Sequence, residues 1–415
     1  MQTTTKQLIL ILIVAFAVRL GGAWYWQSRL QGQFAFGDSM SYWVLGQAIA
    51  QGQPFAHLSP DMKIFRTPGY PLLLAPLFYL AGPEPSVMWA RMLSVVCGTL
   101  AVAAVWRLGK ELFDARAGLL AAAIAALYPG AIATSVLVLS EAPFCPLMLA
   151  QLLLWTVAWK ATTAKRAGIL AFAAGVIAGL ATLVRPSWLL FTPFAIFLAL
   201  LLSPSRRRHL GLGVALLSGL VVAMLPWWIR NAQVTGHFVP TTLQVGASLY
   251  DGWNPKANGA SNMYFVPAFF EAEDRQPAAA GGSPSDTFEY RLDRRFSTAA
   301  VAWAQSHPGE ALRLAWVKFV RMWNFWPNEP SLSAWPIRLA VAFTYLPVLV
   351  LAVFGVWKTI RDGWPYILCW LPAVYFTLLH VVFVSSIRYR QPPMLALMVL
   401  AAGFVVQKHA VGSRE

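Results

Sequence analysis

The sequence predicts an all-α polytopic membrane protein, and three observations support this fold class. Of the 415 residues, 58% are hydrophobic and only 12% are charged, which is unlike the composition of a soluble globular domain. Apolar runs of about 18 or more residues recur along the whole chain, as membrane-spanning helices require. These residues also come in blocks rather than in alternation, which argues against a membrane β-barrel.

Basic residues in the short loops between apolar runs set the predicted spans and their orientation. The net charge is +15, and much of the excess lies in loops such as 110–116 and 206–208, which the positive-inside rule places in the cytoplasm. No nucleic-acid partner is therefore expected. With about 20 residues per span, ten helices are predicted near 7–26, 87–108, 116–136, 142–159, 167–184, 188–203, 210–229, 337–357, 364–384 and 392–407.

The first apolar run, LILILIVAFAVRLGGAWYW, is predicted to be a retained transmembrane helix, because no small-residue cleavage site follows it. The apolar segment from Pro68 to Pro85 is short and interrupted by prolines. Counting it as a span would place the basic loop near residue 110 outside, against the charge rule. It is predicted instead to form a re-entrant or interfacial helix pair on the outer face.

This topology leaves two large outer segments, 27–86 and 230–335, and divides the chain into three parts. These are an N-terminal transmembrane core with the first outer loop (1–229), an outer region (230–335) and C-terminal transmembrane helices with a cytoplasmic tail (336–415). Within the outer region, 276–286 is predicted to be flexible from its Gly, Pro and Ser content. Residues 307–326 are predicted to form an amphipathic helix in the outer headgroup region.

Several ionisable residues fall on the predicted outer side, and ionisable groups that converge at membrane depth predict a functional site. They are Asp38, Lys63, Arg66, Glu141, Arg185, His380, Arg388 and Arg390, with Tyr389 between the last two. Guanidinium groups bind phosphate oxygens through paired hydrogen bonds, so Arg388 and Arg390 predict a site for a lipid phosphate. A carboxylate facing that site can act as general base on an acceptor hydroxyl.

Five short motifs occur in the order found in bacterial GT-C glycosyltransferases. They are GDSMSYW, RTPGYPLLLAPLF, LSEAPF, LVRPSW and IRYRQPP. On these motifs the chain resembles glycosyltransferase family 39, the group of protein O-mannosyltransferases and aminoarabinose transferases. The resemblance covers roughly residues 1–230 and 300–405 and implies a GT-C-like helical core with juxtamembrane helices on the outer face.

The resemblance implies transfer of a sugar from a polyprenyl-phosphate carrier to an acceptor on the periplasmic or lumenal face, with inversion. The family's motifs place its acidic residues on Asp38 and Glu141, its basic residue before a proline turn on Arg66, and its Arg-Tyr pair on Arg388 and Tyr389. Many relatives carry Asp-Glu where this chain has Asp-Ser. The adjacent carboxylate pair that would chelate a metal is therefore missing here, and the sequence leaves open whether a divalent cation, Mg2+ or Mn2+, is used.

Each candidate also has a structural interpretation that the sequence leaves open. Asp38 could cap the helix that SYWVLGQAIA begins, and Glu141 could cap the next transmembrane helix or be a solvated loop charge. Arg66 and Arg185 could extend to lipid headgroups, which is the preferred interpretation for Arg185. Two weaker candidates, Tyr42 and His380, are expected to be an interfacial or packing residue and a hydrogen-bonded helix residue.

The sequence thus predicts a multi-pass glycosyltransferase of the bacterial inner membrane with a periplasmic active site. Its expected partners are a polyprenyl-phosphate sugar, a lipid, glycan or protein acceptor, and membrane lipids. The alternative is a lipid or sugar flippase or a secondary transporter, which also needs charges within the membrane. Transporters usually show paired discontinuous helices in related halves, and this sequence has a single short broken segment.

Overall fold

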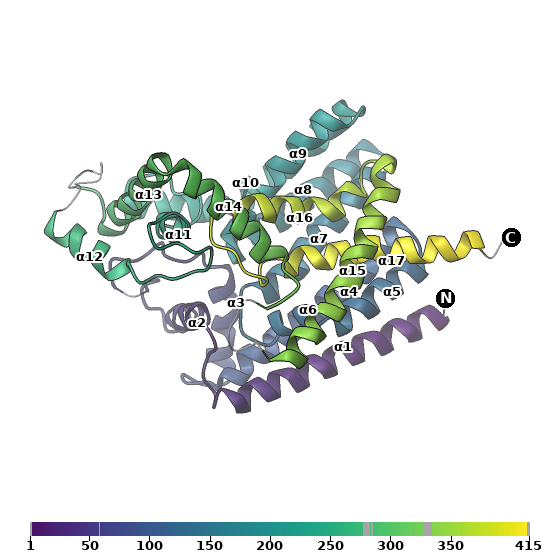
Figure 1. Cartoon of the computed structure of the whole chain (residues 1–415), viewed down its shortest axis with the longest axis horizontal. Helices are drawn as coiled ribbons and strands as arrows, with labels where there is room; N and C mark the ends of the chain where they lie inside the picture. The colour runs from purple at the N-terminus through teal and green to yellow at the C-terminus, as the bar shows by residue number, and fades with distance from the viewer. Residues whose placement is uncertain (1, 58, 277–282, 284, 328–333, 413–415) are drawn as a thin grey trace.

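The computed structural model describes residues 2–57, 59–276, 283, 285–327 and 334–412 of the chain. All regular secondary structure in these residues is helical, as the sequence predicts (Figure 1). Most of the stretch predicted to be flexible, 276–286, lies outside the described residues.

The helices alternate between long apolar rods and shorter segments. In chain order they are α1 (Gln2–Arg29), α2 (Gly37–Ala50), α3 (Gly69–Leu80), α4 (Val87–Leu112), α5 (Ala115–Leu127), α6 (Pro129–Thr134), α7 (Glu141–Lys160), α8 (Ala164–Val184), α9 (Phe191–Leu202), α10 (Arg206–Thr235), α11 (Val245–Gly252), α12 (Val266–Arg275), α13 (Phe288–Ser306), α14 (Pro308–Trp323), α15 (Trp335–Thr359), α16 (Ile367–Val382) and α17 (Gln391–Gly412). Short 3-10 turns follow α8 (Pro186–Trp188) and α15 (Ile360–Asp362).

The molecule has two distinct ends. Figure 1 shows both chain termini at one end of the bundle of long helices, while α2, α11, α12 and α13 gather at the opposite end. These four helices come from 27–86 and 230–335, the two segments for which the sequence predicts an outer location. The fold therefore brings both predicted outer segments to the same end.

Six helices in the described part of the chain are long and apolar enough to cross a membrane: α1, α4, α7, α8, α10 and α15. The other four predicted spans contain the shorter apolar helices α5, α9, α16 and α17. The prediction of one continuous helix over 116–136 is wrong. Helix α5 ends at Leu127, and Pro129 begins the separate helix α6, because proline lacks the N–H that would continue the first helix.

The predicted helix pair between Pro68 and Pro85 is also wrong, since this segment forms the single helix α3, which packs against α2. The residues from Ala81 to Ser86 are not helical. Two prolines in this stretch, Pro83 and Pro85, remove backbone donors that a second helix would need.

The predicted amphipathic helix corresponds to α14. It buries Leu314, Lys318 and Met322, which are spaced by four residues and so lie on one face. Its opposite face exposes large apolar side chains, including Leu312 at 75% and Trp316 at 65%. This distribution suits a helix lying at a lipid surface, which remains a proposal for α14.

Glycines allow α8 and α10 to pack with their backbones in close contact. A Cβ atom on Gly175 of α8 would overlap the carbonyl oxygen of Leu216, and one on Gly219 of α10 would overlap that of Phe172. Membrane helices use small residues in this way, because close backbone approach increases van der Waals contact. The pair holds α8, and therefore the residues that follow it, in a fixed position.

The Gly175→Ala variant is expected to unfold at a lower temperature than the parent protein, because overpacking a tight interface costs ~1–3 kcal/mol. Thermal unfolding of the detergent-solubilised protein measures the effect. Gly168→Ala on the same helix is the control, since nothing lies within 4 Å of its added Cβ. Equal unfolding temperatures for the two variants would contradict the assigned packing.

Candidate active site

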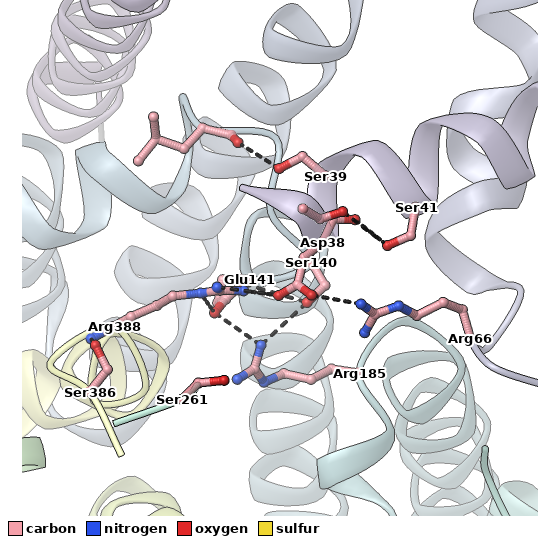
Figure 2. Close-up of polar contacts among 12 residues, drawn as sticks. Asp38, Ser39, Ser41, Arg66, Ser140, Glu141, Arg185, Ser261, Ser386 and Arg388 are labelled. Carbon is pink, nitrogen blue, oxygen red and sulfur yellow. Dashed lines mark hydrogen bonds and ion pairs between the residues drawn. The ribbon is translucent and has the colours of Figure 1, made fainter. Parts of the chain in front are cut away.

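Asp38 lies in the first turn of α2, at the end of the molecule opposite the chain termini (Figure 1). The helix starts at Gly37 with Phe36 in the N-cap position, and no side chain caps it. Asp38 is therefore not the N-cap, and the capping interpretation left open by the sequence is wrong. Its carboxylate is turned instead toward residues that are distant in sequence (Figure 2).

Two arginines hold the Asp38 carboxylate. Arg66 Nη2 donates to Oδ1 at 2.6 Å, and Arg388 approaches Oδ2 with Nη1 at 3.4 Å and Nη2 at 3.5 Å. Partial burial alone would raise the pKa of the Asp38 carboxyl, but the positive charges of Arg66 and Arg388 hold it below its usual value. In this state the carboxylate is ionised and is a weak base.

Glu141, the first residue of α7, forms the second half of the cluster. Its side chain is fully buried, and it accepts hydrogen bonds from Nε and Nη2 of Arg388, the latter at 3.1 Å. Arg185 Nη1 lies 3.0 Å from Glu141 Oε1 and 3.3 Å from the hydroxyl of Ser140. Glu141 is thus neither a solvated loop charge nor the N-cap of α7, a position that Ser140 occupies.

The same contacts correct the preferred interpretation of Arg185 as a headgroup anchor. This residue follows the last residue of α8, and its side chain is only 9% exposed. Its guanidinium group points toward Glu141 and Ser140 (Figure 2). A buried carboxylate without a countercharge is costly, so Glu141 and Arg185 stabilise each other.

A close backbone contact brings Arg66 and Arg185 to the same place. Gly69, at the start of α3, lies so near the end of α8 that a Cβ atom on it would collide with the backbone of Leu183 and Val184. The glycine in the RTPGYP motif therefore has a packing function. It sets the turn that carries Arg66 against the helix end that carries Arg185.

The assembled cluster has an excess of positive charge. It contains the guanidinium groups of Arg66, Arg185 and Arg388 and the carboxylates of Asp38 and Glu141, so three positive charges face two negative ones. The Asp38 and Arg388 side chains are 37% and 18% exposed, so the cluster is open on the Asp38 side. An anion with one negative charge would balance it.

Tyr389 and His380 line the cluster from below without contacting its carboxylates. Their rings stack with centroids 4.1 Å apart, and the guanidinium carbons of Arg185 and Arg388 lie 5.4 and 5.7 Å from the Tyr389 centroid. His380 Nδ1 is 2.8 Å from the carbonyl oxygen of Val384. His380 is thus a hydrogen-bonded helix residue, as the sequence predicts.

Arg390 lies apart from the cluster, although the sequence places it in the phosphate site with Arg388. It is fully buried, donates to the carbonyl oxygens of Met322 and Asn324, and lies over the Tyr345 ring at 3.6 Å. These contacts tie the end of α14 to α15 and to the start of α17. A structural role for Arg390 replaces the predicted phosphate contact.

Two other candidates take no part in the ion pairs of the cluster, and for Tyr42 this agrees with the packing role that the sequence predicts. Lys63 is exposed, and its side chain makes no ion pair with any described residue. Tyr42 is buried against Tyr70 and supports the Arg66 guanidinium, whose central carbon is 5.2 Å from the Tyr42 ring centroid. Tyr42 is therefore a packing residue beneath the site.

Sequence reasoning missed Gln244, whose Oε1 accepts a hydrogen bond of 2.8 Å from Arg66 Nη1. Arg66 is thereby held between Asp38 and Gln244. No sequence signal marks this residue, since it falls in the outer region where the family resemblance is lost. It also missed Ser140, which sits next to Glu141 and accepts from Arg185.

The residues of the cluster do not fit a divalent cation. No group of three or more His, Cys, Asp or Glu side chains that could hold a metal ion occurs in the part of the chain that the structure describes. The two carboxylates are interleaved with three guanidinium groups that would repel a cation. At the position of the relatives' second carboxylate, the buried Ser39 donates to the carbonyl oxygen of Leu137 at 3.3 Å.

Comparison with known proteins agrees with the fold. The model of the family described as dolichyl-phosphate-mannose-protein mannosyltransferase matches residues 66–229, which include Arg66, Glu141 and Arg185. No curated protein is similar enough to the chain to count as a match.

Solved structures show the fold over the whole chain. The oligosaccharyltransferase AglB from Archaeoglobus fulgidus, in complex with an inhibitory peptide and dolichol-phosphate, superposes with a TM-score of 0.60 at 14% identity, covering 99% of this chain and 51% of AglB. The chain thus spans about half the length of that relative. ArnT from Cupriavidus metallidurans bound to undecaprenyl phosphate aligns at 17% identity over 99% of this chain and 79% of ArnT, with a TM-score of 0.46 that is too low to add weight. The chain has the GT-C membrane glycosyltransferase fold.

Proposed function

We propose that the chain is an integral membrane glycosyltransferase that moves a sugar from a polyprenyl-phosphate donor to an acceptor hydroxyl, with inversion. The observation that carries this proposal is the sharing of the exposed Asp38 carboxylate between Arg66 and Arg388 in a GT-C fold. The proposed base thus lies within hydrogen-bond distance of two groups that can bind phosphate. The dolichol-phosphate in the AglB complex supports a polyprenyl-phosphate carrier.

In the proposed reaction, the donor phosphate binds Arg388 and Arg66. Asp38 takes the proton of the acceptor hydroxyl as its oxygen attacks the anomeric carbon, and the bond from that carbon to the phosphate oxygen breaks. The sugar is joined to the acceptor, and the carrier leaves as a polyprenyl phosphate. Its developing negative charge is stabilised by the arginines, which are held in place before the reaction.

The sequence suggests that Glu141 orients acceptor or sugar hydroxyls or helps to hold a divalent cation, and this scheme gives it a different role. Its side chain is fully buried and bonded to Arg185 and Arg388, which leaves no surface for an acceptor or sugar hydroxyl. We assign it to orienting the two guanidinium groups. No step involves a metal ion, because the donor set does not fit one.

Binding of the donor would also activate the base. A phosphate that takes hydrogen bonds from Arg66 and Arg388 competes with Asp38 for the same donors. Once Asp38 loses these partners and gains a negative neighbour, its pKa rises toward and above the usual value. The carboxylate then becomes a stronger base only when a donor is present.

This activation predicts different pH profiles for kcat/KM and kcat, which report the free enzyme and the donor complex. The acid limb of kcat/KM is expected below pH ~3.9, the usual pKa of Asp, because the arginines lower the pKa of Asp38 in the free enzyme. The acid limb of kcat is expected at higher pH. Steady-state rates measured across the acid range test this, and coincident limbs would contradict competition between phosphate and Asp38.

We also place the site on the periplasmic side of the bacterial inner membrane. Basic loops favour a cytoplasmic location for the end of the bundle that carries both termini, and the cluster belongs to segments at the other end (Figure 1). Accessibility of a cysteine introduced at the exposed Asp61 to a membrane-impermeant reagent in intact spheroplasts tests this orientation.

The decisive experiment is incubation of the purified protein in nanodiscs with labelled polyprenyl-phosphate sugars, followed by mass spectrometry of lipid, glycan and protein acceptors. Covalent transfer of label to any acceptor supports the proposal. Movement of the labelled lipid between leaflets without covalent transfer would instead support the flippase alternative. The family match over residues 66–229 and the GT-C fold favour transfer over lipid movement.

A further inference from the structure

Helix α13 carries two acidic side chains in the part of the outer region that the family resemblance does not cover. Glu289 and Asp293 are four residues apart and so lie on the same face of the helix. Neither forms an ion pair within the described residues. Both accept hydrogen bonds from backbone N–H groups of segments that lead to the cluster.

Glu289 holds the turn that carries Arg66. Its side chain is buried, and its Oε2 accepts from the backbone N–H groups of Lys63 at 2.8 Å and Ile64 at 2.9 Å. These donors lie three and two residues before Arg66. The carboxylate thus fixes the backbone directly preceding the guanidinium that binds Asp38.

Asp293 holds the segment that carries Gln244, the other partner of Arg66. Its Oδ1 accepts from the backbone N–H of Gly246 at 2.6 Å. Gly246 packs so tightly on α13 that a Cβ atom there would overlap the carbonyl oxygen of Asp293. The backbone N–H of Leu243 in turn donates to the carbonyl oxygen of Ile64 at 3.0 Å, which joins the two segments.

The surroundings of both carboxylates disfavour their charged forms. Burial raises the pKa of Glu289 to about 7 and that of Asp293 to about 6, against the opposing effect of their backbone hydrogen bonds. The negative charge of Asp293 also raises the pKa of Glu289, while Arg230 and Arg294 lower the pKa of Glu289 and of Asp293, respectively, without offsetting the effect of burial. Apolar residues at both positions would avoid the cost of burying a charge. The contribution of Glu289 and Asp293 therefore lies in the backbone N–H groups that their carboxylates hold in place.

We propose that Glu289 and Asp293 are positioning residues that set the Arg66 guanidinium between Asp38 and Gln244. The inference rests on the proposed function, because it gives α13 the task of keeping Arg66 in the donor-phosphate site. It also assigns a role to the outer region, which the sequence leaves without one. Without the Glu289 carboxylate the backbone before Arg66 is free to move, and without the Asp293 carboxylate the backbone next to Gln244 is free to move. In either case the Arg66 guanidinium is no longer held in one position.

A double-mutant cycle on binding of sugar-free undecaprenyl phosphate tests this role. Glu289→Ala is expected to weaken binding about tenfold in the parent protein and less than twofold in the Arg66→Ala background. If Glu289 acts only through Arg66, the losses of binding free energy from the two substitutions are not additive. Glu289→Gln keeps a carbonyl acceptor and is expected to restore most of the affinity. Glu271→Ala, at an exposed site on α12, is the control and should change nothing.

Equal losses from Glu289→Ala in both backgrounds would mean a merely structural role and would overturn the inference. Hydrogen exchange provides a readout that needs no lipid. The amides of Lys63 and Ile64 are expected to exchange faster in Glu289→Ala than in the parent protein, and unchanged exchange also overturns the inference. Unchanged lipid binding in Arg66→Ala alone contradicts the proposed function instead, so the two failures are distinguishable.

Discussion

The Asp38→Asn variant is expected to lose transfer activity by about a hundredfold to ten-thousandfold, the range that general-base catalysis contributes, while it still binds the donor lipid. Asparagine has nearly the shape of aspartate, and its carbonyl oxygen can still accept the hydrogen bond from Arg66. It cannot take a proton from the acceptor. Donor binding by the purified variant and single-turnover transfer with labelled donor measure the two effects separately.

Asp61→Asn is the matched control for this substitution. Asp61 is an exposed acid in the same first outer segment and forms no ion pair with any residue that the structure describes. Its variant should transfer sugar at the parental rate. Substantial turnover by Asp38→Asn would remove Asp38 from the role of base and would require another proton acceptor.

The Arg388→Ala variant is expected to bind the donor about tenfold to a hundredfold more weakly, since hydrogen bonds to charged groups contribute ~1.5–3 kcal/mol and each 1.4 kcal/mol is tenfold in affinity. It should also be less stable. Arg388 is one of two countercharges for the buried Glu141, and removing one partner of a buried pair is strongly destabilising. Equilibrium binding of undecaprenyl phosphate and thermal unfolding measure the two losses.

A second variant separates folding from phosphate binding. Combining Arg388→Gln with Glu141→Gln removes the buried carboxylate together with its countercharge, so much of the lost stability should return. The donor affinity should stay low, because the guanidinium is still absent. If the double variant binds donor as the parent protein does, Arg388 is not part of the phosphate site.

The helical fold was largely predictable, and so was the gathering of the segments 27–86 and 230–335 at one end of the molecule. Membrane spans are long apolar runs that can be recognised in the sequence alone. The approach of Asp38 to Arg388 was predictable for a different reason, since both residues fall in motifs that the predicted topology places on the same face of the membrane. The sequence-based predictions failed for the ends of individual helices near prolines, such as the break between α5 and α6 before Pro129. Each such break depends on where neighbouring segments satisfy the freed backbone groups.

The correct assignment of the arginines could not be read from the sequence. Arg388 and Arg390 are two residues apart in the turn before α17, yet one reaches Glu141 and the other reaches Met322 and Asn324. Their neighbours in space come from different parts of the chain. Arg185 looked like a headgroup anchor for the same reason, because only the folded chain shows that its side chain turns inward to Glu141.

The single surplus positive charge of the cluster has a consequence for turnover. In the proposed reaction the donor is a phosphodiester with one negative charge, whereas the carrier released is a monoester with about two at neutral pH, as for other phosphate monoesters. After transfer Asp38 holds a proton, so the three arginines and Glu141 leave two positive charges that match the product. We therefore expect the released carrier to inhibit the enzyme. When Asp38 loses the proton it took from the acceptor, its carboxylate can again bind Arg66 and Arg388, which weakens the binding of the carrier and favours its release.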